Sequence, residues 1–190
     1  MRKLFLYMAM TLDGFIAGPN NELDWMQMPD QENNDDVVAL LDGADTGLMG
    51  YPTASGMIPY WASVPDNPSA SKGEVALAQA INKIHSIVIS NKEEKIGWDN
   101  SALLLIKSDN DLIDAVSKLK QQPGRDLGVP GGVRTAQRFA RLSLVDEYVL
   151  MVHPVALGNG KRLFTSKVNL EMISAKTFKT EIMRVCYRPR

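Results

Sequence analysis

Residues 126–142, DLGVPGGVRTAQRFARL, decide the fold class of this chain. Residues 126–129 are a short apolar run typical of a buried strand, and residues 133–142 repeat apolar positions at helical spacing. Gly131 and Gly132 stand between the two. A strand that turns through glycines into a helix is the repeating step of a sheet covered by helices. The segment therefore predicts an α/β fold.

The same alternation extends in both directions along the chain. Apolar runs predict strands at residues 3–10, 46–49, 86–90, 102–106 and 145–152. Amphipathic patterns predict helices at residues 31–41, 73–84 and 109–121, with Asp30 capping the first and Asp109 or Asn110 the last. A short helix is expected at 52–57, and loops at 13–29 and 58–72. The tail, residues 170–187, predicts two more strands. We expect one domain, residues 1–190, with a mostly parallel central sheet and antiparallel C-terminal strands.

Composition excludes several classes of protein. The chain has 190 residues, 45% of them hydrophobic, and a net charge of −1, which favours a globular protein without a nucleic-acid or membrane partner. No run approaches the roughly 18 apolar residues that a membrane span needs. Cys186 is the single cysteine, so no internal disulfide can form, and we expect a buried thiol and a cytoplasmic location. With only His85 and His153, we expect no metal site.

The glycine pair is the first candidate site. A helix start exposes backbone N–H groups and the positive end of the helix dipole, and glycines let a phosphate approach closely. A diphosphate could sit over Gly131 and Gly132 and the N–H groups of Val133, Arg134 and Thr135. The same glycines also fit a tight connection that binds nothing.

Two other predicted strand ends carry polar groups. Gly50, Tyr51 and Thr53 follow one strand, where Thr53 could contact a phosphate or only cap a helix. Ser90 and Asn91 follow another, where they could contact a ribose or form a solvated turn. The carboxyl ends of parallel strands line one edge of a sheet, which is where such folds bind ligands.

Together these pieces resemble the dihydrofolate-reductase-like superfamily, in particular its bacterial branch related to the reductase domain of riboflavin biosynthesis (RibD C-terminal domain). The matching motifs are Thr11-Leu12-Asp13-Gly14-Phe15-Ile16-Ala17, Leu48-Met49-Gly50-Tyr51-Pro52-Thr53, Leu144-Val145-Asp146-Glu147-Tyr148, and the most specific block, HPVALGNGKRLF at residues 153–164.

The resemblance implies a three-layer α/β/α fold and a nicotinamide cofactor, usually NADPH, with NADH possible. By position, Ala9 and Ile16 would face the nicotinamide, and Gly50, Tyr51 and Thr53 the diphosphate. Ser90 and Asn91 would face the adenosine, and residues 131–135 the phosphates. The resemblance also implies a cis peptide between the paired glycines.

The implied chemistry is hydride transfer to a small pteridine- or pyrimidine-like heterocycle or to a carbonyl compound, in a homodimer whose late strands supply the interface. A carboxylic acid is the usual proton donor in such sites. Asp13, Asp30 and Glu32 are the candidates, although each also fits a loop cap or a surface charge.

The chain departs from the family at two positions. Tyr51 stands where the family usually has Arg, which suits phosphate contact, and Pro130 stands where riboflavin-pathway reductases commonly have Glu. The alternative interpretation is therefore a nucleotide- or pterin-binding protein with little or no catalysis, and a third is a structural or interaction domain.

Overall fold

The structure is a computed structural model that describes residues 1–27 and 29–190. The described residues form two compact units. The first unit contains Met1–Arg2 and Asp30–Gly128, and the second contains Lys3–Pro29 and Val129–Arg190. The chain thus passes from one unit to the other three times.

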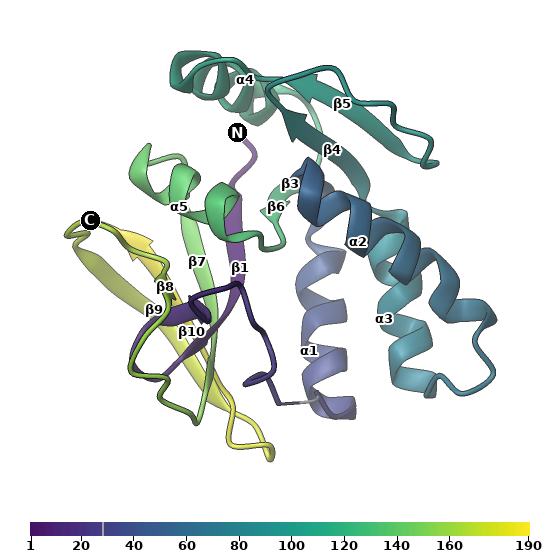
Figure 1. Ribbon diagram of the computed structural model, residues 1–190, viewed down its shortest axis with the longest axis vertical. Coiled ribbons are helices and arrows are strands. Elements are labelled where there is room, and N and C mark those ends of the chain that lie inside the picture. Colours follow the sequence, from purple (N-terminus) through teal and green to yellow (C-terminus); the bar gives the residue numbers. More distant parts are fainter. Residues whose placement is uncertain (28) are drawn as a thin grey trace. The chain divides into compact units, whose positions relative to one another are not determined.

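The first unit is a parallel sheet with helices (Figure 1). β3 (Ala44–Gly50) pairs in parallel with β4 (His85–Ser90) on one side and with β6 (Asp126–Val129) on the other. β5 (Ser101–Leu105) pairs in parallel with β4. Helices α1 (Gln31–Asp42) and α3 (Lys72–Lys83) lie side by side, and α2 (Tyr51–Ser63) and α4 (Asp109–Gln121) complete the unit together with the 3₁₀ turn Val64–Asp66.

Local sequence explains where these helices begin. Asp30 caps α1, as predicted: its carboxylate accepts a hydrogen bond from the Asn33 N–H at 2.9 Å, and the Asn33 side chain accepts one from the Asp30 N–H. Ser71 forms the same reciprocal arrangement with Glu74 in α3. In α4 the cap is Ser108 rather than Asp109 or Asn110, because Asp111 is placed to bond back to the Ser108 N–H at 2.9 Å.

The second unit contains the antiparallel strands. β1 (Leu4–Thr11) pairs in parallel with β7 (Glu147–His153), and β10 (Met183–Pro189) runs antiparallel to both β7 and β9 (Leu170–Thr177). α5 (Val133–Arg141) precedes β7. A separate ribbon joins β2 (Phe15–Ala17) to β8 (Lys161–Arg162). These directions confirm the expected mostly parallel sheet with antiparallel C-terminal strands.

Each unit has its own apolar interior. In the first unit Leu48, Val88, Leu112, Val116 and Leu127 are at most 1% exposed. In the second unit the fully buried side chains include those of Leu4, Leu6, Phe139, Tyr148 and Val149. Cys186 is buried and free, as expected. The alternation of strand and helix seen in the sequence is therefore the pattern that fills these interiors.

Two predictions about the loops were wrong. The helix expected at 52–57 continues to Ser63 through Pro59, whose missing N–H costs a hydrogen bond. Ile58 packs against buried Met49, Ala54 and Val88, and this apolar contact favours continuing the helix. The loop expected at 13–29 contains β2, which is held by its pairing with β8 and has no periodicity of its own to reveal it.

Candidate glycine turn and strand-end site

The glycine turn lies where the sequence predicted it, between β6 and α5. Gly131 and Gly132 have φ angles of 109° and 82°, a region that favours glycine. Gly132 is the residue that caps α5, and no side chain bonds to the helix start. A Cβ built on Gly131 would meet no atom of the described residues within 4 Å, so there is free space beside this residue, although the glycine itself is buried. The expected cis peptide is wrong for the described residues, which contain none.

The first turn of α5 presents its main-chain amides. The Ala136 N–H donates to the Gly132 carbonyl at 2.8 Å, which is the first hydrogen bond of the helix. The N–H groups of Val133, Arg134 and Thr135 precede it, at positions that have no acceptor within a helix. Three amides at the positive end of a helix, next to an open glycine turn, are arranged as an anion-binding site.

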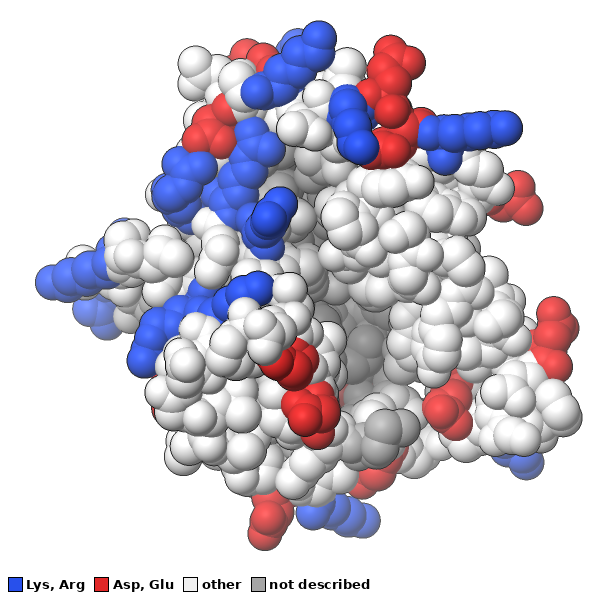
Figure 2. Space-filling model, in the orientation of Figure 1, with Lys and Arg blue, Asp and Glu red and all other residues white. Residues whose placement is uncertain are grey.

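The side chains of α5 add positive charge. Its sequence, VRTAQRFAR, carries Arg134, Arg138 and Arg141, and Figure 2 shows Lys and Arg side chains gathered over this helix. Arg134 is exposed and lies in the first turn, beside the amides described above. A cation near a helix start gains nothing from the helix itself, so the position of Arg134 is more consistent with an anionic ligand than with helix stability, whereas Arg138 and Arg141 lie in the last turn, where the helix dipole favours them.

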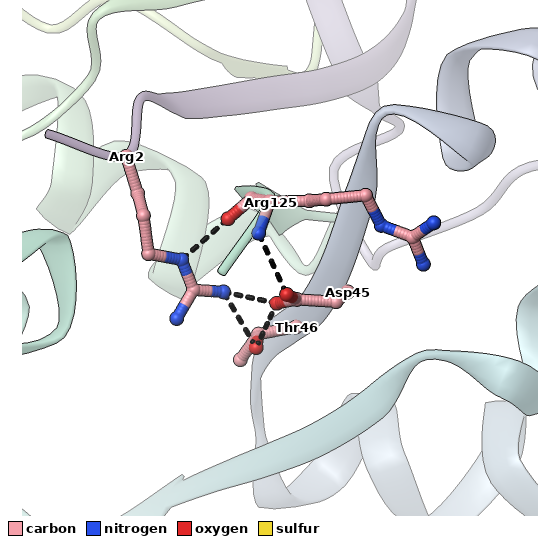
Figure 3. A network of polar contacts seen from close by, with 4 residues as sticks. All are labelled: Arg2, Asp45, Thr46 and Arg125. Carbon is pink, nitrogen blue, oxygen red and sulfur yellow. Dashed lines mark hydrogen bonds and ion pairs between the residues drawn. The ribbon is translucent and has the colours of Figure 1, made fainter. Parts of the chain in front are cut away.

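The charged group around Arg2 in the first unit serves the fold instead (Figure 3). Arg2 is 7% exposed and pairs with Asp45. Its guanidinium also donates to the Thr46 hydroxyl at 2.8 Å and to the Arg125 carbonyl, while the Arg125 N–H donates to Asp45 at 2.7 Å. These donors are used by protein acceptors, so we do not assign a ligand to the group.

The predicted strand-end residues of the first unit are brought together. β3 and β4 end beside each other, because Gly50 pairs with Ile89, the residue before Ser90. Ser90 is 8% exposed and its hydroxyl accepts the Lys92 N–H at 3.2 Å, which closes a turn at exposed Asn91. Thr53 lies in the first turn of α2, whose cap is Gly50 without a side-chain bond, so Thr53 is not the cap.

Tyr51 has an aromatic partner. Its ring lies 6.0 Å from that of Trp98 at an interplanar angle of 34°, and both pack on the cluster of Met49, Ala54 and Val88. Both rings remain partly exposed. Where the family usually has a cation, this chain therefore presents an aromatic surface.

The residues expected to face a nicotinamide lie in the second unit. Ala9 is half-buried in β1, opposite Met151 of β7. Ile16 is 2% exposed in β2, so its side chain belongs to the interior of the unit. These residues and the glycine turn share one unit, whereas Gly50, Tyr51, Thr53, Ser90 and Asn91 belong to the other.

The carboxylate of Asp13 accepts hydrogen bonds from neighbouring residues. It accepts from the Thr11 hydroxyl at 2.5 Å, from the Gly158 N–H at 2.7 Å and from the Leu157 N–H at 3.2 Å. The bond from Thr11 is the main cause that lowers the pKa of Asp13; burial opposes it, and the N–H groups of Gly158 and Leu157 lower the pKa further. A carboxyl held ionised in this way fastens its loop and is unsuited to donate a proton at neutral pH.

The other two carboxyl candidates lie in the first unit. Asp30 is occupied as the cap of α1. Glu32 is half-buried in the first turn of α1, where a negative charge stabilises a helix. Neither shows an arrangement specific to acid catalysis, so the proton donor stays a prediction without a contact that supports it.

From the sequence, His153 was considered only as a possible metal ligand, and its contacts were missed. The buried ring accepts a hydrogen bond from the backbone of Gln27 and packs against Trp25, both in the first loop. Only the position of His153 at the end of a predicted strand, within the HPVALGNG block, could have indicated a special environment.

Metal and membrane sites are not found in the part of the chain that is described. Within residues 1–27 and 29–190, no three His, Cys, Asp or Glu side chains gather as metal ligands would. No described helix combines the length and apolarity needed to traverse a bilayer.

Comparison with known proteins decides the family. The family model for the RibD C-terminal domain matches residues 2–184. The chain belongs to the RibD C-terminal domain family. A curated relative is the uncharacterized protein YyaP of Bacillus subtilis. It is 35% identical to this chain over 191 residues, which cover 98% of this chain and 94% of YyaP.

Solved structures show the same fold. A putative riboflavin biosynthesis protein from Shewanella sp. PV-4 is 25% identical with a TM-score of 0.73, covering 99% of each chain. Dihydrofolate reductase from Enterococcus faecalis, solved with NADP(H), is 11% identical with a TM-score of 0.62, covering 99% of this chain and 96% of that one. The RibD C-terminal domain of this chain therefore has the dihydrofolate-reductase-like, three-layer α/β fold.

Proposed function

We propose that the protein is an NAD(P)H-dependent reductase of a small pteridine- or pyrimidine-like heterocycle or of a carbonyl compound. The observation that carries the proposal is the start of α5, where an open glycine turn, three main-chain amides and Arg134 form an anion-binding arrangement. Membership in a reductase-like family supports the same class of reaction.

The chain's own residues have defined parts in this proposal. The amides of Val133, Arg134 and Thr135 bind the diphosphate, and Asp13 fastens the first loop to Leu157 and Gly158. A bound reduced nicotinamide supplies the hydride, and the protein supplies binding and orientation. From the family resemblance, Gly50, Tyr51 and Thr53 are assigned to the diphosphate, and Ser90 and Asn91 to the adenosine.

Ligand-induced thermal shift tests the binding step. NADPH or NADH at 100 times its Kd is expected to add about 2.7 kcal/mol of stability. Arg134→Glu places a repelling charge beside the amides without harming the helix start, so the affinity should fall about tenfold or more, the change that about 1.4 kcal/mol produces. Arg141→Glu, at the other end of α5, is the control and should leave the affinity nearly unchanged.

Hydride transfer is tested with the cofactor that binds. Loss of reduced-nicotinamide absorbance should depend on a dihydropterin, an aminopyrimidinone or a small aldehyde, and R134E should raise the KM for the cofactor more than it changes kcat. Absence of binding by both cofactors refutes the proposal.

A second candidate function is binding of a nucleotide or pterin with little catalysis. The aromatic surface of Tyr51 and Trp98 favours it, since planar heterocycles stack on such rings. A thermal shift with a pterin or nucleotide, without turnover when a nicotinamide is added, would select this function over the reductase.

We also propose a homodimer in the cytoplasm. β9 is the edge of its sheet, and its Met172 and Ile173 are 55% and 48% exposed. An exposed apolar edge strand favours pairing with another chain. Light scattering should give twice the 21.0 kDa mass of the chain, and Ile173→Lys should reduce it to one chain. Cell fractionation tests the location.

A further inference from the structure

A buried histidine joins the first loop to the sheet of the second unit. His153 ends β7, pairs with Thr11 of β1 and is 3% exposed. Its Nδ1 lies 3.2 Å from the backbone N of Gln27, which donates to it. The Trp25 ring meets the imidazole edge to face, at 5.4 Å between centroids and 90° between planes. One side chain thus holds two residues of the loop.

Apart from the contacts with His153 and a hydrogen bond from Lys161 to Asn21, the described bonds of residues 18–27 lie within the loop. The Gly18 N–H donates to the Glu22 carbonyl at 2.9 Å, and the Trp25 indole donates to the same carbonyl at 3.2 Å. Residues 20–24, 26 and 27 are exposed. The attachment to buried His153 is therefore a contact that could be lost without unfolding the loop itself.

This attachment requires a neutral imidazole. Because Nδ1 accepts from Gln27, the proton of the neutral ring is on Nε2. Protonation would place an N–H on Nδ1 facing the Gln27 N–H, and two donors cannot bond to each other. It would also place a charge in a site that is closed to water.

The charged groups of the surrounding elements have other partners or lie in solvent. Asp13, after β1, is bound by Leu157 and Gly158, and Glu22 accepts from Asn20. Lys161 of β8 donates to Asn21, Asp24 is exposed, and Arg184 of β10 pairs across from Met151 rather than His153. Burial lowers the pKa of His153, and it is the one cause that acts among the described residues.

We propose that His153 is a pH-sensitive switch for the first loop: the neutral ring holds residues 25–27, and protonation releases them. Since the Gln27 N–H bonds only to an unprotonated Nδ1, holding the loop disfavours protonation of the ring, in the same direction as the burial that lowers the pKa of His153. The attachment is thus fully present above the ordinary histidine pKa of 6.5, and it weakens as the pH falls below that value toward the lowered pKa.

Two NMR measurements on the full chain test the switch. The chain has two histidines, so His85→Gln assigns the ring signals and His153 can be titrated alone. Amide exchange of Gln27, corrected for its intrinsic pH dependence, then reports the attachment. The Gln27 protection factor should fall as the pH drops below 6.5, by up to about tenfold per pH unit, in step with the His153 ring titration.

His153→Asn separates titration from structure, because its amide oxygen keeps an acceptor near the Nδ1 position and does not titrate in this range. In H153N the Gln27 protection should not depend on pH, whereas H85Q should behave as the wild type. If H153N does not fold, the wild-type pair of measurements still decides. A ring that titrates at or above 6.5, or Gln27 protection that is constant from pH 7 to 5, overturns the proposal. Neither result depends on the proposed reductase activity.

Discussion

Arg2 and Asp45 form an ion pair across 43 positions of the chain, with the arginine side chain 6% exposed and the aspartate side chain 34% exposed. The pair fixes the N-terminus of the first unit to the start of β3, and through Arg125 to the turn before β6. Removing one member leaves the other without its counter-charge. This makes the pair a site where single substitutions should have large effects.

Arg2→Met should lower the free energy of unfolding by about 2–3 kcal/mol, because Asp45 loses its bonded cation and keeps only the nearby charge of Arg125, and the Arg125 carbonyl loses a donor. Chemical denaturation at pH 7 measures the loss. Lys72→Met, which removes an exposed cation at the start of α3, is the control and should stay within about 0.5 kcal/mol of the wild type. Equal effects of the two substitutions would show that Arg2 contributes only surface charge.

Asp45 should make stability depend on acidity. Burial raises the pKa of Asp45, but the Thr46 hydroxyl, the Arg125 N–H and the Arg2 and Arg125 charges outweigh it, so the pKa is lowered overall. The stabilisation is therefore complete above the ordinary pKa of 3.8 and is lost as the pH falls through the lowered value. Denaturation of Asp45→Asn between pH 7 and pH 2 should show a shallower acid loss than the wild type. Parallel curves would contradict the assignment.

Gly160 and Gly158 should respond differently to alanine. Both have positive φ, 154° and 72°, so both substitutions strain the backbone. A Cβ at Gly160 would also collide with the Ala17 carbonyl across the β2–β8 ribbon, whereas one at Gly158 meets nothing within 4 Å. Gly158→Ala should cost about 1–2 kcal/mol and Gly160→Ala clearly more. The difference in thermal midpoint measures the close approach, and equal midpoints would refute it.

Asp13→Asn should act on stability rather than on proton transfer. The substitution weakens the bonds to Thr11, Leu157 and Gly158 and should cost about 1–2 kcal/mol. If turnover is detected, the pH dependence of kcat should keep its shape. Loss of the alkaline limb in D13N would instead identify Asp13 as the proton donor, since a general acid must be protonated to act.

Tyr51→Arg should strengthen cofactor binding. It restores the cation that the family usually has after Gly50, beside the expected diphosphate, so a charge-assisted bond should improve the binding of NADPH and of NADH alike, by about tenfold. Tyr51→Leu removes the stacking on Trp98 without adding charge and should not give this gain. Titration of each variant with both cofactors measures the affinities. An affinity for both cofactors that is unchanged in Y51R would exclude this position from phosphate contact.

Sequence patterns predicted the elements that have internal periodicity. The helix at 109–121, the cap at Asp30 and the two late strands all depend on residues near each other in the chain. β2 and β8 contain three and two residues, too few for a pattern, and exist because Gly160 lets the two strands approach. The extension of α2 through Pro59 depends on packing by Ile58, which propensity alone opposes.

The candidate site was predictable to a similar extent. The glycine turn before α5 lies where it was expected, because its residues are adjacent in the sequence. The contacts of Asp13 with Gly158 and of Gln27 with His153 span 145 and 126 positions, so no local pattern contains them. Because these contacts could not be seen in the sequence, Asp13 was named as a candidate acid, and the contacts of His153 were not predicted.

The pairing of β1 with β7 has a consequence for biosynthesis. Phe5 lies opposite Glu147, so the first strand leaves the ribosome long before its parallel neighbour has been translated. Throughout that interval the apolar segment LFLYMAMT lacks its partner strand β7. A nascent chain that exposes such a segment is vulnerable to aggregation. The protein should therefore need chaperones mainly during the time between the synthesis of β1 and that of β7. Slowing translation upstream of residue 147 lengthens this time and should lower the yield of folded protein.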